Sequence, residues 1–329
     1  MAVTLVALML FWQVQCSVNK PMVSMLAMAE VPCWLRLLHR QIAPLTEELM
    51  HYPTILVHAD LSPAAPSRIA LAAQLALDGR SHLIGSAACG VSQLMYLGTP
   101  FHGGGAATGE VLQRAKVCAE KALIQFDQIT TELGVASSES HLSTTEGDAA
   151  LSAHALFADL IIVSQPPPAP EPTTAGARHL PEKLILQSGR PVLIVPHEGN
   201  FPTLGERPVI AWDGGQSAMR AVTAALPLLR KAKMATVVSF NARMCSGARS
   251  DESCAAIALY LARHGVDSEV VCRHSAVDDG SAILSFVAEV NADLLVMGGY
   301  GHSRLFELVL RSATRTVLDN MQTPVLMAH

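Results

Sequence analysis

Short apolar runs alternate with longer amphipathic segments from Thr54 onward. The run TILVHA at 54–59 predicts a strand, and the pattern after it predicts a helix from about Pro66 to Leu77. The same order recurs when PVIAW at 208–212 predicts a strand, followed by Asp-Gly-Gly and a helix that runs toward Lys231. This alternation is typical of βαβ units, so the sequence predicts an α/β fold with a mostly parallel sheet.

Three short motifs occur twice along the chain in the same order, with offsets of 131 to 134 residues. The repeated pairs are ADLIIV (158–163) and ADLLVM (292–297), PVL (191–193) and PVL (324–326), and Gly134-Val135 and Gly265-Val266. Asp60 and Asp213, which follow the first strand of each copy, are 153 residues apart, so the first copy carries about twenty extra residues. We therefore predict a tandem duplication with about five strands per copy and helices on both faces of each sheet.

Aspartates and glycines mark the predicted helix ends. Gly134 and Gly265 follow helical patterns and are expected just beyond the last turn, where glycine adopts a left-handed backbone at low cost. Asp251 and Asp279 are expected as N-caps of the two following helices. Asp278 and Asp279 could together hold a cation, but a helix cap is the expected role.

Composition and charge exclude several classes of protein. The 329 residues are 50% hydrophobic, 16% charged and 5% aromatic, which provides enough apolar side chains for two packed domains and excludes a disordered or collagen-like chain. The formal net charge of -5 argues against a nucleic-acid binder, which needs a basic face.

The cysteines indicate neither a disulfide framework nor a zinc site. They are odd in number, scattered, and never spaced as CxxC. This favours a reducing compartment, so we expect a cytoplasmic protein. The seven cysteines are Cys16, Cys33, Cys89, Cys118, Cys245, Cys254 and Cys272.

The segment 1–49 has a different character from the rest. Val3 to Val14 is apolar but shorter than the roughly 20 residues of a membrane-spanning helix, and the first basic residue is Lys20, so a secretory signal is not expected. A weak membrane-surface anchor is one interpretation. The favoured one is a poorly ordered leader, or a start codon placed too early with Met50 as the true start.

A glycine-rich loop follows the predicted strand at 293–297. It reads GGYGHS at 298–303, and Arg311-Ser312 then precedes a predicted helix at 313–320. Glycines let the backbone turn sharply after a buried strand and bring N–H groups close to a ligand. Ser312 would cap the helix, whose N-terminus favours an anion such as phosphate.

These patterns resemble a known family: residues 54–328 are similar to two universal stress protein domains in tandem. ATP-binding members of that family carry G-x2-G-x9-G-[S/T] before the last helix and strand, and an Asp-Gly-Ser turn after the first strand. Here the second copy has Gly298-x2-Gly301-x9-Arg311-Ser312, and Asp213-Gly214-Gly215 stands at the turn. The closing strand TPVLM at 323–327 also fits.

The resemblance implies a fold and a set of ligand contacts. Each copy would be a flavodoxin-like or Rossmann-like (HUP-type) three-layer domain with a mostly parallel five-stranded sheet. Asp213 would approach the adenine of ATP, the glycines and His302 would line the sugar and phosphates, and Ser312 would meet a phosphate. The resemblance also allows a Mg²⁺ ion to bind together with the ATP. The candidate nucleotide-binding residues are Asp213, Gly214, Gly298, Gly301, His302, Arg311 and Ser312.

Arg311 is the main departure from the family pattern. It replaces the third glycine, whose missing side chain lets a phosphate come close. The guanidinium could fold over the site and pair with phosphate, or its bulk could close the site. Both outcomes stay open.

The first copy lacks the glycine pattern. Residues 164–172 read SQPPPAPEP, and prolines offer no N–H to a phosphate, so this copy is not expected to bind nucleotide in the family's way. A stiff surface loop is favoured over a polyproline ligand for a partner. Asp60 remains at the strand end, where a helix cap is the expected role.

The sequence thus predicts a degenerate universal stress protein domain at 50–199, a linker at 200–206 and a second domain with the nucleotide-type loop at 207–329. The strands at 191–195 and 324–327 are expected to pair the two copies as an internal pseudo-dimer, and a homodimer of the whole chain stays open. No catalytic constellation emerges, and the resemblance implies an adenine-nucleotide-binding stress-response protein with at most slow ATP hydrolysis. The alternative is a scaffold that binds no nucleotide and acts through protein partners.

Overall fold

The computed structural model describes residues 51–90, 104–165, 179–240, 250–300 and 313–329. The leader at 1–49 and the proline run after Gln165 lie outside these residues, as do Gly301, His302, Arg311 and Ser312. The described residues belong to one compact unit that begins at His51.

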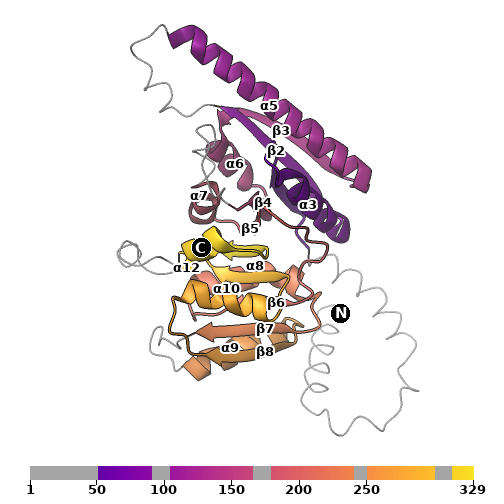
Figure 1. Ribbon diagram of the computed structural model, residues 1–329. Coiled ribbons are helices and arrows are strands. Elements are labelled where there is room, and N and C mark those ends of the chain that lie inside the picture. Colours follow the sequence, from indigo (N-terminus) through magenta and orange to yellow (C-terminus); the bar gives the residue numbers. More distant parts are fainter. Residues whose placement is uncertain (1–50, 91–103, 166–178, 241–249, 301–312) are drawn as a thin grey trace, which may run out of the picture. The chain divides into compact units, whose positions relative to one another are not determined.

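Two groups of five strands alternate with helices along the chain (Figure 1). The first group contains β1 (Thr54–His58), α3 (Ala65–Gly79), β2 (His82–Gly90), α5 (Gly104–Leu133), β3 (Ser138–Glu146), α6 (Gly147–Ala155), β4 (Leu160–Ser164), α7 (Leu180–Gln187) and β5 (Val192–Val195). The second contains β6 (Pro208–Ala211), α8 (Gln216–Leu229), β7 (Ala235–Phe240), α9 (Ser250–Arg263), β8 (Ser268–Arg273), α10 (Asp279–Glu289), β9 (Leu294–Gly298), α12 (Ala313–Asn320) and β10 (Val325–Ala328).

The ten strands of the described residues form one sheet in the order β3-β2-β1-β4-β5-β10-β9-β6-β7-β8. Within each half every neighbouring pair is parallel, and the third, second, first, fourth and fifth strands of the half follow one another. The halves meet at β5 and β10, which pair antiparallel with Leu193 opposite Leu326. The α/β class, the five parallel strands per half and the pairing of these two strands agree with the sequence analysis.

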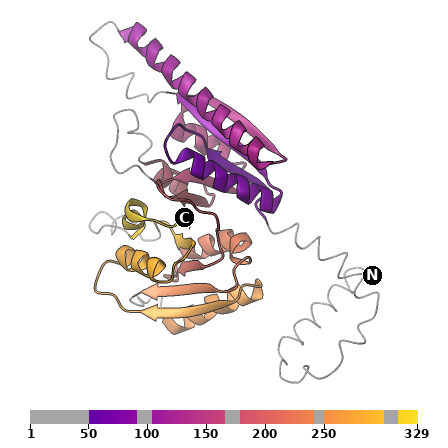
Figure 2. The same ribbon diagram turned by 45° about the vertical axis from the view of Figure 1, so that its right-hand side comes forward.

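Helices cover both faces of the sheet. Alternate strand residues point to opposite faces, so Ile55 and Val57 belong to a core that includes residues of α3, α5, α8 and α9, whereas Leu56 belongs to a core that includes residues of α6, α7, α10 and α12. Each face carries a hydrophobic core that runs through both halves. Figures 1 and 2 show the longest helix, α5, lying along β2 and β3.

The repeated Ala-Asp motif has the same structural role in both halves. Asp159 precedes β4, and its carboxylate accepts the backbone N–H of Thr54 at 2.9 Å. Asp293 precedes β9, and its carboxylate accepts the backbone N–H of Arg207 at 2.9 Å. The motif therefore ties the start of the central strand to its neighbour in each copy, which supports the duplication.

Polar contacts join the halves beside the β5–β10 pair. The buried Tyr52 hydroxyl donates to the carbonyl of Ala224 at 2.7 Å, and Gln165 donates to the carbonyl of Leu318 at 3.0 Å. Residues 196–207 connect β5 to β6 without a helix or strand, and they include the predicted linker.

The helix ends agree with the predictions at glycines and differ at aspartates. Gly134 and Gly265 follow α5 and α9 with φ of 79° and 76°, as expected. The prediction that Asp279 caps α10 is wrong by one residue, because Asp278 is the N-cap and accepts the N–H of Ser281. Asp251 is not the residue before α9 either, since that helix begins at Ser250.

A search of the described residues finds no helix that is both long and apolar enough to cross a bilayer.

Candidate functional site

The candidate site of the second half begins at the turn after β6. The Oδ1 atom of Asp213 accepts the N–H of Gly215 at 2.7 Å, and Gly214 adopts a φ of 76°. This conformation favours glycine, and the turn leads directly into α8, for which Gly215 is the N-cap. Asp213 and Gly214 are exposed, so both are accessible to a ligand.

Gly298 ends β9 at the same edge of the sheet. β6 and β9 are parallel neighbours with Ala211 opposite Met297, so the carboxyl ends of both strands lie together. A Cβ atom at Gly298 would lie 2.6 Å from the backbone nitrogen of Ala218 and 3.0 Å from the Cβ of Ser217. Only a glycine lets α8 approach this closely. The structure thus brings Gly298 to the edge that carries the Asp213 turn.

The residues after Gly298 are anchored on both sides. Gly299 donates to the carbonyl of Ala328 at 2.9 Å, and its own carbonyl lies 3.0 Å from Nδ1 of His329. Tyr300 has a φ of 55°, and its N–H donates to the buried Thr314 side chain at 3.2 Å. These bonds fix where the glycine-rich loop leaves the sheet. The candidate nucleotide-binding residues Gly301, His302, Arg311 and Ser312 lie outside the described residues.

A buried arginine fills the corresponding place in the first half. The Arg68 side chain is fully buried, and its Nε donates to the carbonyl of His58 at 2.9 Å. Its Nη1 donates to the Ser164 hydroxyl, and its Nη2 lies 3.0 Å from Oδ1 of Asp60. The guanidinium therefore connects the carboxyl ends of β1 and β4.

The charges around Arg68 shift two neighbouring groups. Burial lowers the pKa of His58 to about 4, with the Arg68 charge acting in the same direction and the Asp60 charge against it. Burial alone would raise the pKa of Asp60, but Arg68, His58 and the hydrogen bonds from Ser62 hold it well below its usual value. Asp60 is therefore a charged partner of Arg68. It is not the helix cap that the sequence predicted, because Ala64 is the N-cap of α3.

Comparisons with known proteins identify the second half. Residues 207–329 match the family model of the universal stress protein family. These residues form a universal stress protein domain. No curated protein sequence matches the chain.

Solved structures extend the fold over both halves. A universal stress protein from Archaeoglobus fulgidus is 16% identical, with a TM-score of 0.66 over 84% of this chain and 95% of its own. A candidate universal stress protein from Pseudomonas aeruginosa is 18% identical, with a TM-score of 0.51 over 85% of this chain and 94% of its own. At these identities the likeness concerns the fold, and it covers both halves.

The universal stress protein domain and the first half can be aligned at the crevice. Buried helix positions match at the 153-residue offset that relates Asp60 to Asp213, so His58 and Arg68 correspond to Ala211 and Ala221. Ser164 corresponds to Gly298 at the 134-residue offset of the motifs in β4 and β9. The matching buried pairs are Ile69 and Val222, Ala72 and Ala225, and Ala76 and Leu229.

Every residue of the Arg68 cluster except the aspartate therefore has a small counterpart in the universal stress protein domain. Sequence reasoning missed this cluster. The available signal was a charged residue at a position of α3 that the helical spacing places on the buried face.

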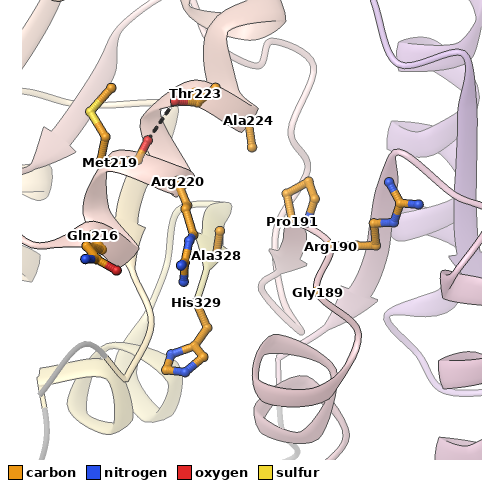
Figure 3. Close-up of a pocket in the computed structure, with 10 residues that line it drawn as sticks. All are labelled: Gly189, Arg190, Pro191, Gln216, Met219, Arg220, Thr223, Ala224, Ala328 and His329. Atoms are coloured by element: carbon orange, nitrogen blue, oxygen red, sulfur yellow. Dashed lines mark hydrogen bonds between the residues drawn. The ribbon is translucent and has the colours of Figure 1, made fainter. Parts of the chain in front are cut away.

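A separate cavity lies beside the universal stress protein domain. It measures about 520 Å³ and lies between α8, the end of β10 and the turn before β5 (Figure 3). Figure 3 shows Arg220 and His329 on one wall, whereas the Arg190 side chain points away and donates to the carbonyl of Leu156 at 2.6 Å. Among the described residues that line this cavity, none is a predicted nucleotide contact. Its lining residues are Gly189, Arg190, Pro191, Gln216, Met219, Arg220, Thr223, Ala224, Ala328 and His329.

No cluster of His, Cys, Asp or Glu side chains with the arrangement of a metal site occurs in the part of the chain that the structure describes.

Proposed function

We propose that this protein binds one adenine nucleotide per chain, ATP, in the crevice between β6 and β9 of the second half. Open α/β sheets bind ligands outside the carboxyl ends of their strands, where the strand order reverses. In this half the order reverses between β6, which is followed along the chain by β7, and β9 on its other side. The Asp213 turn and Gly298 lie at this point.

The observation that carries the proposal is the contrast in side chains at the two crevices. Ala211, Ala221 and Gly298 add at most a methyl group each where the first half places an imidazole, a guanidinium and a hydroxyl. The family match over 207–329 and the resemblance to its ATP-binding motif support the choice of nucleotide. The exposed Asp213 turn at this edge of the sheet supports the proposal that the adenine lies there.

The same contrast in side chains supports different roles for the two domains. We propose that residues 50–199 form a degenerate domain, joined through residues 200–206 to the nucleotide-binding domain at 207–329. The antiparallel pairing of β5 and β10 then makes the chain an internal pseudo-dimer. Such pairing removes an edge strand from each half.

Calorimetric titration of nucleotide-free protein with ATP tests the proposal. We expect one site per chain, and we expect Asp213→Ala to weaken binding at least tenfold, about 1.4 kcal/mol. Asp267→Ala, which removes another exposed carboxylate of the same half, is the matched control and should bind like the unaltered protein.

Arg311→Gly distinguishes the two roles left open for that side chain. Weaker ATP binding by the variant would show that the guanidinium pairs with phosphate, and tighter binding would show that its bulk obstructs the site. Absence of binding by both proteins would overturn the proposal and support the scaffold alternative. Two sites per chain would contradict the assignment of the first half.

A further inference from the structure

Two thiols lie side by side at the outer end of the second half. Cys254 lies in α9 and is 5% exposed, whereas Cys272 lies in β8 and is exposed to solvent. Their Sγ atoms are 3.9 Å apart. Among the four cysteines that the structure describes, this is the one pair whose sulfur atoms are within hydrogen-bonding distance.

The surroundings of the pair allow the sulfur atoms to come closer. A disulfide has an S–S distance of about 2.05 Å, so the two Sγ atoms must approach by roughly 2 Å. Among the strands that the structure describes, β8 is the last of the sheet and pairs with β7 alone, so no other described strand restrains its outer edge.

We propose that Cys272 is an oxidation site for peroxide and that Cys254 resolves the oxidised sulfur as an intramolecular disulfide. Exposure gives a small oxidant access to Cys272, while the position of Cys254 beneath the surface favours its reaction with the neighbouring sulfur over its reaction with solvent species. The outcome is a covalent link between α9 and β8.

The chemistry takes place in two balanced steps. The Cys272 thiolate attacks one oxygen of the peroxide, the O–O bond breaks, and Cys272 becomes a sulfenic acid as hydroxide leaves and takes up a proton to form water. The Cys254 thiolate then attacks the Cys272 sulfur, the S–O bond breaks, and a second water leaves. Two thiols are oxidised and one peroxide is reduced.

The position of the pair gives its oxidation a structural consequence. Ser253, which precedes Cys254 in α9, accepts a hydrogen bond from the indole N–H of Trp212 at 3.0 Å. Trp212 is followed directly by Asp213. The disulfide would therefore fix the helix that holds the turn after β6.

Peptide mapping of the full chain tests the proposal directly. Cleavage after Lys and Arg places Cys254 in the peptide 250–263 and Cys272 in the peptide 264–273, each with a single cysteine. After hydrogen peroxide and alkylation under non-reducing conditions, we expect these two peptides to be linked. Cys254→Ser should abolish the link and leave Cys272 as sulfenic or higher acids.

Cys118→Ser provides the matched control, because Cys118 is also exposed but lies in α5. This variant should keep the link between the two peptides. Oxidation of Cys272 at the same rate as Cys118 without a linked product would overturn the proposal. A product that joins Cys272 mainly to Cys245 would also overturn it.

Thermal unfolding offers a second readout that does not depend on the mapping. A disulfide between these residues closes a loop of about 18 residues in the unfolded chain, so the oxidised protein should unfold about 5 °C above the reduced one. The Cys254→Ser variant should show no such shift. An equal shift in this variant would contradict the assignment of the pair.

Discussion

The two halves share a fold but differ at the crevice between their central strands. In the first half the Arg68 guanidinium binds His58, Ser164 and Asp60 and occupies that place. In the second half the corresponding residues have small side chains, and the aspartate holds a glycine turn. A duplicated fold therefore keeps its strands and its pairing while one crevice is filled with a structural ion pair.

The contrast between the two crevices also distinguishes the roles of Asp60 and Asp213. Asp60 binds Arg68 and accepts both the N–H and the hydroxyl of Ser62, so its carboxylate is committed to protein partners. Asp213 accepts only the N–H of Gly215 among the described residues and is exposed. The same residue at the same strand end thus serves stability in one copy and remains available to a ligand in the other.

Removal of the Arg68 side chain should disrupt the contacts that fill the first crevice and should have the largest effect on stability. Arg68→Ala leaves the Asp60 carboxylate without its cation and removes the part-buried hydrogen bond to Ser164, which should lower the free energy of unfolding by about 4 kcal/mol. Urea unfolding measures this change. Arg220→Ala, which removes an exposed arginine from α8, is the control and should change stability by less than about 0.5 kcal/mol.

A small effect of Arg68→Ala would contradict the idea that the first crevice is held together by this ion pair. Loss of folding would agree with the expected direction. In that case Arg68→Lys, which keeps the charge but loses the fork of donors, should show an intermediate loss.

The pH dependence of stability provides the next test of the same crevice. The pKa of His58 falls from 6.5 to about 4 on folding, so the unfolded chain takes up a proton at a higher pH than the folded protein. His58 therefore does not affect the free energy of unfolding above about pH 6.5, and it lowers that free energy by about 2–3 kcal/mol as the pH falls from 6.5 toward 4. Urea unfolding at several pH values measures the slope.

His58→Gln should remove this part of the pH dependence, whatever its effect on overall stability. His274→Gln, an exposed histidine in the second half, is the matched control and should leave the slope in place. An unchanged slope in His58→Gln would show that other groups carry the acid sensitivity. Below about pH 4 the protonation of Asp60 should destabilise the fold further, because its pKa is also lowered.

The sequence predicted the architecture because the elements are encoded locally. Buried parallel strands such as β4 and β9 are continuous apolar runs, and the recurrence of such runs in the same order at similar offsets indicates the duplication. Gly134 and Gly265 mark helix ends through a backbone preference that belongs to the residue itself. Asp278 was missed in favour of Asp279 because adjacent aspartates have the same capping chemistry.

The filled crevice was not predicted because it depends on contacts between distant segments. Arg68 donates to Ser164, which lies 96 residues further along the chain, and no local pattern connects the two. A buried arginine is rare unless it is paired, so the residue type by itself does not indicate a buried ion pair. For the second crevice, the motif predicted Asp213, Gly214 and Gly298 at one edge of the sheet, and the strand register places them there.

Gly298→Ala tests the second crevice and should lower the stability of the protein by less than Arg68→Ala does. The added Cβ would lie 2.6 Å from the Ala218 backbone nitrogen, so α8 or β9 must shift, which should lower the free energy of unfolding by about 2 kcal/mol. Gly109→Ala is the matched control, because Gly109 lies in α5 with nothing within 4 Å of an added Cβ. That change should stabilise the protein by about 0.5–1 kcal/mol, since alanine is the better helix former. Equal effects of the two substitutions would show that close approach of α8 is not what keeps position 298 a glycine.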